Sequence, residues 1–386
     1  MPGDVMIEKV KLRSRDLTVG EAIPWSIYDE AGRLLLQKGE IIPTVQKIDT
    51  IMMIGGYRHE EVTASEENLP NSTSKVVEVP PLLPPIKQVE LFIDQCHELL
   101  LAFLKNDQNA STRTINLCKE IVEHCEEHAD MLLGAIHFFE QEYNELSQAK
   151  HQIHMAVLAE LLAKRLDLDV DARINIIAAA LTCNVGMYEI ACHLQQQPGE
   201  LTDKQKLFIN NHPDRSVNVL SKNGVSNALW LQSIAQHHEH IDGGGYPLGV
   251  IGDQIVIGAR VLNLAETYAA MTSPRAYRET LASKEALREL FVARSKQIDE
   301  VLAATFIKEM GIYPPGAIVH LANGDLAVVV RRGADSHAPI AVALRKNDGS
   351  VYEEYLYRDC SDEEFAIQDI AKVDVSDLFD PTIVWG

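Results

Sequence analysis

Positive charge is scarce in this sequence. Its 386 residues include 35 lysines and arginines against 56 aspartates and glutamates, so the formal net charge is -21 at pH 7. An acidic surface of this kind repels phosphate backbones and anionic lipid head groups. We therefore expect no binding to nucleic acid polymers, although a local basic pocket can still hold one small anionic ligand.

Paired cysteines and long apolar runs are scarce as well. The six cysteines form no Cys-x-x-Cys pair and no disulfide-like spacing, which favours a reducing compartment, and we expect the cytoplasm. We expect no membrane span, because no apolar run approaches the length of one, and the N-terminus MPGDVMIEKVKLRSRD does not have the pattern of a signal peptide. No solenoid repeat, DNA-binding motif or receiver-like phosphorylation site is evident.

Four segments of different composition divide the chain. We predict a small mixed or β domain over residues 1–65, a proline-rich linker over 66–88, an all-α domain over 89–310 and a small β module over 311–386. The expected fold class is therefore multidomain and mainly α, with a helical domain flanked by two small β-containing modules.

Residue periodicity and turn signals support this division. In the middle segment, apolar residues such as Ile115, Cys118 and Ile121 recur every three or four positions, which is typical of amphipathic helices. In the C-terminal segment, Asn323-Gly324-Asp325 and Asn347-Asp348-Gly349 each separate two short apolar runs, which predicts two β-hairpins. A similar signal at residues 29–32 predicts a hairpin in the N-terminal segment.

Four histidines have neighbours that favour a ligand site. His151 opens a predicted helix with a continuous apolar face, and His212 directly precedes a proline. His237 and His238 end a predicted helix immediately before the glycine-rich loop HHEHIDGGGYPLG. Each histidine taken alone is more often structural than functional. Their combination supports the hypothesis of a metal or phosphate site.

Several motifs between about residues 140 and 310 resemble, in their order, the HD-GYP family of HD hydrolases, which act on cyclic dinucleotides such as cyclic di-GMP. They are QQQPGELTDKQ, NHPDRSVNVL, HHEHIDGGGYPLGVIGDQI and ARVLNLAETYAAMTSPRAYR. The N-terminal segment also resembles a small domain often fused ahead of such modules. The resemblance implies a helical pocket in which two or three metals, commonly iron or manganese, support phosphodiester hydrolysis.

The resemblance also assigns candidate site residues. The metal ligands that it implies are His151, His212, His237, His238 and Glu266. The candidate nucleotide contacts are Gly245, Tyr246 and Pro247, together with Arg275 and Arg278 for the phosphates. The alternative for the two arginines is pairing with local acids such as Glu279.

The sequence departs from the family pattern where a His-Asp pair is expected. Cys183 and Asn184 replace that pair, Met187 replaces a lysine, and Ser147 stands where a carboxylate is usual. Cys183 can serve as a thiolate ligand or as a small buried apolar residue, and we expect the second. The amide of Asn184 offers one neutral oxygen and cannot bridge two cations as a carboxylate does. At a further position where the family pattern has an acidic residue, this sequence has Ala269.

Three functions follow as alternatives from these departures. The first is a degenerate HD-GYP protein that binds a cyclic dinucleotide or a partner, such as a diguanylate cyclase domain, with little or no hydrolysis. The second is a metal-dependent cyclic di-GMP phosphodiesterase with a reduced metal site. The third is a scaffold without ligand or metal. We expect the chain to bind either one divalent metal, namely iron, manganese or zinc, or no metal.

Overall fold

The computed structural model describes residues 6–12, 17, 20, 22–28, 33–42, 51, 57–62, 85–139, 144–197, 199–273, 280–293, 296–371, 373 and 379–385. The chain divides into two compact units, Met1–Pro80 and Pro81–Gly386. Most of the described residues are helical, and the strands form two separate sheets. Of the linker predicted over 66–88, residues 66–84 lie outside the described part of the chain.

The first unit contains a four-stranded antiparallel sheet. Its strands are β1 (Met6–Lys11), β2 (Ile27–Tyr28), β3 (Leu34–Leu36) and β4 (Tyr57–Val62), in the order β1-β4-β2-β3. Strands β2 and β3 pair antiparallel, as the hairpin signal predicts, although the turn residues 29–32 lie outside the described part of the chain. Ile27 and Ile42 are fully buried in a small apolar core.

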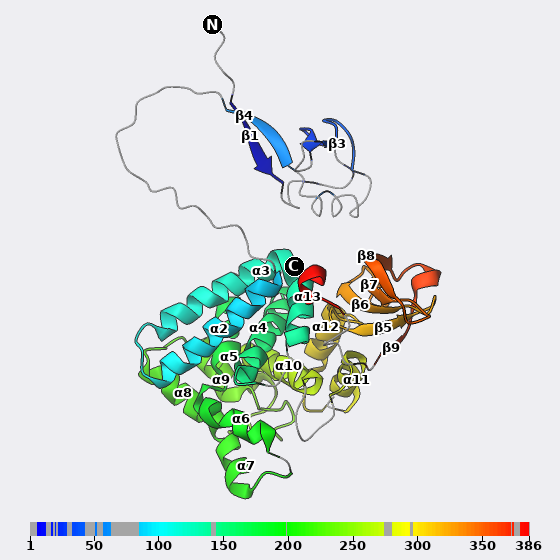
Figure 1. Cartoon of the computed structure of the whole chain (residues 1–386). Coiled ribbons are helices and arrows are strands. Elements are labelled where there is room, and N and C mark those ends of the chain that lie inside the picture. Colours follow the sequence, from blue (N-terminus) through cyan, green and yellow to red (C-terminus); the bar gives the residue numbers. More distant parts are fainter. Residues whose placement is uncertain are drawn as a thin grey trace, which may run out of the picture. The chain divides into compact units, whose positions relative to one another are not determined.

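The second unit is built mainly from helices (Figure 1). They are α2 (Pro85–Leu104), α3 (Ala110–Phe139), α4 (Ser147–Arg165), α5 (Val170–Thr182), α6 (Tyr188–Gln196), α7 (Asp203–Asn210), α8 (His212–Lys222), α9 (Ala228–Gln236), α10 (Ile257–Thr272), α11 (Ser283–Arg288), α12 (Glu300–Met310) and α13 (Pro381–Val384). Short helical turns lie at η2 (Val185–Met187), η3 (Gly252–Gln254), η4 (Glu289–Ala293) and η5 (Glu363–Phe365). No strand interrupts the described residues between 85 and 310, so the prediction of a helical middle segment is confirmed.

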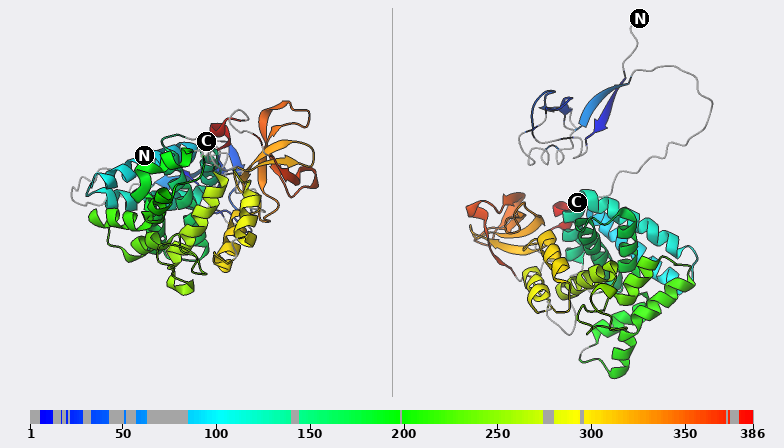
Figure 2. Two further views of the ribbon diagram at one scale, coloured as in Figure 1. Left: turned by 90° about the horizontal axis from the view of Figure 1, so that it is seen from below. Right: turned by 180° about the vertical axis from the view of Figure 1, so that it is seen from behind.

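Helix α4 is the central helix of this unit, because every residue from Gln148 to Ala163 is buried. Helices α5 and α10 pack against it. Local capping fixes where the neighbouring helices start. The Asp169 carboxylate accepts the Ala172 N–H at 2.8 Å before α5, and Thr202 forms a capping box with Gln205 before α7. Helix α7 projects from the helical body in both side views (Figures 1 and 2).

A five-stranded antiparallel sheet follows the helices. Its strands are β5 (Ile318–Leu321), β6 (Leu326–Arg331), β7 (Ile340–Arg345), β8 (Val351–Asp359) and β9 (Ile367–Ile370), in the order β8-β7-β6-β5-β9. Strands β5 and β6 pair across Asn323-Gly324-Asp325, and β7 and β8 pair across Asn347-Asp348-Gly349. Both C-terminal hairpin predictions are thus confirmed.

This sheet packs on the helices within one compact unit (Figure 2). Arg332, which follows β6, pairs with Asp130 of α3 at 2.5 Å and with Glu309 of α12 at 2.6 Å. Near the C-terminus, the indole of Trp385 lies against Gly134 of α3, where a Cβ atom would meet the ring at 2.5 Å. The C-terminal module is therefore anchored to the helical core by buried contacts.

One apolar stretch, Val170–Ala191, is long and apolar enough by composition to cross a membrane, so the expectation that no run approaches that length is too strong. The stretch covers α5, η2 and the first turn of α6, and 67% of its most apolar window is buried inside the protein. It forms part of the core of the helical unit, where buried helices have the same composition as membrane spans.

Candidate metal centre

Two histidines face each other at helix ends. His212 is the first residue of α8, and His237 directly follows α9. Both side chains are fully buried, and their Nε2 atoms lie 3.1 Å apart. Helix α8 begins at His212 because Pro213 occupies the first turn, where the missing N–H of proline does no harm.

Hydrogen bonds to backbone fix the tautomers of these two rings. His212 Nδ1–H donates to the Ile209 carbonyl and His237 Nδ1–H donates to the Ile234 carbonyl, each at 2.6 Å. Burial lowers the pKa of His212 and lowers the pKa of His237 well below its ordinary value, so both rings are neutral. Each Nε2 atom then carries a lone pair, and two lone pairs 3.1 Å apart repel unless a cation lies between them.

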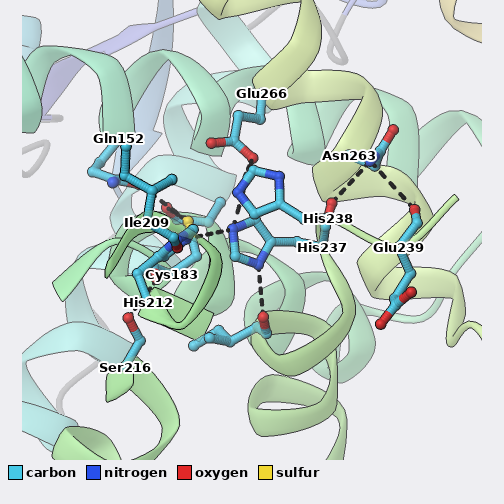
Figure 3. A network of polar contacts seen from close by, with 12 residues as sticks. Gln152, Cys183, Ile209, His212, Ser216, His237, His238, Glu239, Asn263 and Glu266 are labelled. Atoms are coloured by element: carbon cyan, nitrogen blue, oxygen red, sulfur yellow. Dashed lines mark hydrogen bonds and ion pairs between the residues drawn. The ribbon is translucent and has the colours of Figure 1, made fainter. Parts of the chain in front are cut away.

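A third histidine and a carboxylate complete the group (Figure 3). The ligand atoms of His212, His237 and His238 lie within 4.8 Å of one another. Glu266 of α10 places a carboxylate oxygen 3.7 Å from His237 Nε2 and 3.6 Å from His238 Nε2. Burial lowers the pKa of His238 well below its ordinary value, and the neighbouring His212 adds to this effect.

These separations fit one metal ion. A tetrahedral metal with ligand bonds of about 2.1 Å holds its ligand atoms about 3.4 Å apart. The measured separations of 3.1, 3.6 and 3.7 Å lie on both sides of that value. Neutral imidazoles with free Nε2 lone pairs, together with one carboxylate, are ligands that suit zinc, iron or manganese.

The first candidate ligand along the chain, His151, does not belong to the three-histidine cluster. It is buried on α4, but it is not among the three histidines whose ligand atoms are mutually close. Ser147, at the start of the same helix, is engaged locally: its Oγ donates to the Asn144 carbonyl at 2.7 Å and accepts the Asn144 N–H at 2.8 Å.

Cys183 is a protonated thiol in the core. It is fully buried at the end of α5, and burial raises its pKa well above the ordinary value, with the charge of Glu266 adding to the shift. Its Sγ lies 3.6 Å from both the Gln152 side-chain oxygen and the Ala180 carbonyl oxygen, and each is an acceptor for the S–H. In Figure 3, Gln152 and Cys183 lie on one side of the imidazoles, and Asn263 and Glu239 lie on the other. A neutral, hydrogen-bonded thiol is a poor metal ligand.

Asn184, the second altered position, is buried beside α8. Its Oδ1 atom has no hydrogen-bond partner among the described residues. The preceding carbonyl, at Cys183, accepts from Ser216 Oγ at 2.6 Å, and Ser216 Oγ in turn accepts the Gly186 N–H at 2.9 Å. Ser216 lies one turn after His212, so these bonds fix the segment 183–186 against the helix that carries a candidate ligand.

The two remaining altered positions, Met187 and Ala269, are neutral residues. Met187 ends η2 and is half-buried, and Ala269 is fully buried in α10. Arg275 and Arg278, the candidate phosphate contacts, lie outside the described residues.

The glycine-rich loop packs directly on the ligand segment. A Cβ atom at Gly245 would lie 2.5 Å from Glu239 Cα and would clash with the backbone of His238 and His240, so only glycine fits. Tyr246 then stacks on the His238 ring, with ring centroids 4.6 Å apart and an interplanar angle of 23°. Pro247 follows in a half-buried position.

Two residues at this site were not among those that sequence reasoning selected. Asn263 Nδ2–H donates to the His237 carbonyl at 2.9 Å, and Glu239 Oε1 accepts the Leu248 N–H at 2.6 Å. Asn263 precedes Glu266 by one helical turn, so it lies on the same face of α10. This three-residue spacing is the feature of the sequence that could have indicated Asn263 as a site residue.

Comparison with known proteins finds relatives of the helical segment that carries this cluster. The HD domain family model matches residues 117–302. The chain is 31% identical over 182 residues to the cyclic di-GMP phosphodiesterase PA4108 of Pseudomonas aeruginosa, which covers 47% of this chain and 44% of that protein. It is 31% identical over 163 residues to the cyclic di-GMP phosphodiesterase response regulator RpfG of Xanthomonas campestris pv. campestris, covering 41% of this chain and 42% of that protein.

Another relative acts on a different cyclic dinucleotide. The chain is 28% identical over 166 residues to the 3'3'-cGAMP-specific phosphodiesterase 3 of Vibrio cholerae, covering 43% of this chain and 36% of that protein. The matches thus span less than half the length of these curated relatives. Among solved structures, Bd1817 of Bdellovibrio bacteriovorus, described as an HDGYP protein, matches 78% of this chain and 99% of that chain at 13% identity, with a TM-score of 0.49.

Residues 117–302 of the helical core therefore match the HD domain family. The ordered motifs and the Gly-Tyr-Pro loop beside a histidine cluster resemble the HD-GYP branch of that family, and the same segment is similar to cyclic dinucleotide phosphodiesterases.

Proposed function

We propose that this chain binds a cyclic dinucleotide of the cyclic di-GMP class at a site that holds one divalent metal, with little or no hydrolysis. The observation that carries this proposal is the difference between the two halves of the site. Two neutral imidazoles present Nε2 lone pairs 3.1 Å apart in one half, whereas Cys183 in the other half is a protonated thiol bonded to Gln152.

His212, His237, His238 and Glu266 would hold the metal. When bound, a divalent metal neutralises phosphate charge and makes a coordinated water more acidic. The chain itself keeps the imidazoles neutral through burial, fixes two of them by Nδ1–H bonds to backbone and supplies one carboxylate. We place His151 with this set as an outer candidate, since it is buried but lies outside the mutual cluster.

The altered half of the site lacks the charge that a second cation needs. Asn184 and Ser147 are neutral where the family pattern has carboxylates, and Cys183 stays protonated. Two divalent ions a few ångströms apart repel strongly unless anionic ligands lie between them. Two-metal catalysis places one ion on the attacking oxygen and one on the leaving oxygen, so a site limited to one ion loses part of this stabilisation.

The nucleotide contacts are proposed on the loop side. Gly245, Tyr246 and Pro247 lie beside His238, and the absence of a side chain at Gly245 lets the loop approach closely. Arg275 and Arg278 remain our proposed phosphate contacts because Met187 supplies no charge. We propose diguanylate cyclase domains as possible protein partners and the cytoplasm as the location, where the five buried thiols stay reduced.

One experiment tests this function on the full chain. The protein is loaded separately with Fe(II), Mn(II) or Zn(II), and metal content, cyclic di-GMP and 3'3'-cGAMP affinity and turnover are measured on the same sample. We expect one metal per chain, measurable nucleotide binding and turnover no faster than that of His237→Ala. Two or more tightly bound metals, or fast turnover that His237→Ala abolishes, would favour a phosphodiesterase with a reduced site. Absence of both metal and nucleotide would favour a scaffold.

A further inference from the structure

His238 differs from the other two histidines in how its ring is held. His212 and His237 each donate Nδ1–H to a carbonyl at 2.6 Å. For His238, the described residues provide no hydrogen bond to Nδ1, and its Nε2 lies 3.6 Å from Glu266, beyond hydrogen-bond distance. A metal ligand usually needs a second contact that fixes the orientation of its ring.

The His238 ring has three aromatic contacts, with centroids 4.1 Å from the His237 ring, 5.0 Å from the His212 ring and 4.6 Å from the Tyr246 ring, and only the Tyr246 ring is stacked on it. The Tyr246 ring lies nearly parallel to the imidazole, with centroids 4.6 Å apart and planes at 23°. Parallel stacking restricts rotation about the bond that joins Cβ to the ring, because rotation would drive the imidazole edge into the tyrosine.

The backbone around this stack is fixed by several hydrogen bonds. The Tyr246 N–H donates to the His238 carbonyl at 3.1 Å, which ties the two stacked residues together. Glu239 Oε1 accepts the N–H groups of Leu248 and Gly249 at 2.6 and 3.2 Å, which holds the chain directly after the tyrosine.

Asn263 fixes the other side of the ligand segment (Figure 3). Its Nδ2 donates to the His237 carbonyl at 2.9 Å and approaches the Glu239 carbonyl at 3.5 Å. The carbonyls of residues 237, 238 and 239 are therefore each contacted by a donor. With the backbone fixed in this way, the ring torsion of His238 is the main remaining freedom, and Tyr246 restricts it.

We infer that Tyr246 is a positioning residue for the third ligand: its ring, and not its hydroxyl group, sets the orientation in which His238 presents Nε2. This inference rests on the metal site of the proposed function. It gives the tyrosine of the loop a role inside this chain that is separate from contact with a nucleotide.

The test uses Co(II) as the metal probe and the full-length protein. Co(II) affinity is measured from visible ligand-field bands for the parent chain, Tyr246→Phe, Tyr246→Leu and Leu248→Ala. Phenylalanine keeps the stacked ring and loses the hydroxyl, whereas leucine keeps the apolar volume and loses the ring. Leu248→Ala is the matched control, because this exposed side chain lies in the same loop and its backbone N–H to Glu239 is retained.

We expect Tyr246→Leu to weaken Co(II) binding about tenfold or more, which is the usual effect of removing a partner that orients a metal ligand. Tyr246→Phe and Leu248→Ala should stay within about twofold of the parent chain. Equal affinity in Tyr246→Leu and the parent chain would overturn the inference, and so would an equal loss in Tyr246→Phe.

A second measurement separates this inference from the metal proposal. In the metal-free protein with histidines labelled at Cε1, the Tyr246 ring shifts the His238 ring-proton resonance. That shift should persist in Tyr246→Phe and disappear in Tyr246→Leu, with the His212 and His237 resonances unchanged. If the parent chain binds no Co(II) but the shift behaves in this way, the metal proposal fails and the positioning contact stands. An unmoved His238 resonance in Tyr246→Leu overturns the contact in either case.

Discussion

The two halves of the candidate site differ in what their buried groups are bonded to. In the half formed by α8, α9 and the glycine-rich loop, the Nδ1 atoms of His212 and His237 are bonded to backbone and the Nε2 atoms point at each other. In the half formed by α4 and the end of α5, Cys183 is bonded to Gln152 and Ser147 is bonded to Asn144.

This difference separates a half that keeps the ligand types of the family pattern from a half in which they are replaced. The altered half holds the neutral side chains of Cys183, Asn184 and Ser147, and the buried Asn184 Oδ1 atom has no hydrogen-bond partner among the described residues. The retained half holds neutral imidazoles whose lone pairs repel, so a cation there would relieve a cost of burial. Each of the following changes acts on one half and leaves the other as a reference.

The largest effect is expected from removing a ligand of the retained half. His237→Ala deletes one of the two Nε2 atoms that lie 3.1 Å apart and should weaken metal binding by roughly a hundredfold or more. Metal titration of the full chain measures this loss. His240→Ala is the control, because His240 lies in the same segment outside the three-histidine cluster. Equal losses in both variants would show that the segment, and not the ligand, determines binding.

Restoring the altered half should raise the number of bound metals. We expect the triple variant Cys183→His, Asn184→Asp and Met187→Lys to bind more metal per chain than the parent chain and to gain cyclic di-GMP hydrolysis. Single variants should gain neither, since a bridging ligand acts only when both ions are held. Because Cys183 is fully buried, a histidine there overpacks the core at a cost of about 1–3 kcal/mol, so the metal-free triple variant should melt at a lower temperature.

Metal analysis and product chromatography on the triple variant decide this prediction. Unchanged metal content would mean that Ser147 or the geometry of α4 limits the second ion. Hydrolysis of cyclic di-GMP by the single variant Met187→Lys would contradict the claim that activity requires a carboxylate at position 184 to bridge two metals.

A smaller effect is expected from crowding the loop. Gly245→Ala places a methyl group against the backbone of residues 238–240, so the loop must shift and Tyr246 must leave its stacked position on His238. We expect metal affinity to fall about tenfold. Gly244→Ala is the matched control, because a Cβ atom there meets only the Asp242 side chain, at 3.1 Å. A similar result for both variants would show that the loop tolerates movement.

The smallest effect concerns pH. Burial lowers the pKa of His212, and it lowers the pKa values of His237 and His238 well below 6.5. In the unfolded chain these rings take up protons near pH 6.5, whereas the folded protein takes them up only at lower pH. The unfolded state then binds more protons, so the free energy of unfolding of the metal-free protein should fall as the pH drops below about 6.5.

Urea unfolding of the metal-free protein across that range measures the slope. Metal should flatten the upper part of the profile, because a bound cation competes with protons for the same lone pairs. A stability that is constant below pH 6.5 would show that these imidazoles are already charged or exposed in the folded protein.

Much of the fold could be predicted from the sequence. Apolar residues three or four apart gave the helical middle segment, because a helix with one buried face needs that spacing. The turns at Asn323-Gly324-Asp325 and Asn347-Asp348-Gly349 gave two hairpins, since glycine and asparagine supply the backbone angles that tight turns require. The composition of Val170–Ala191 was misjudged, because a helix buried on all sides is as apolar as a membrane span.

The candidate site also has features that the sequence determines and features that only the tertiary structure determines. The sequence by itself determined which residue types are present: four candidate histidines, a glutamate and a glycine-rich loop, with cysteine and asparagine where a His-Asp pair is expected. Only the tertiary structure decided that Cys183 is a protonated thiol bonded to Gln152, that His151 lies outside the mutual cluster, and that Asn263 and Tyr246 hold the ligand segment. Protonation state and ring orientation depend on burial and on neighbours from distant segments, so they follow from the packed structure and not from motif spacing.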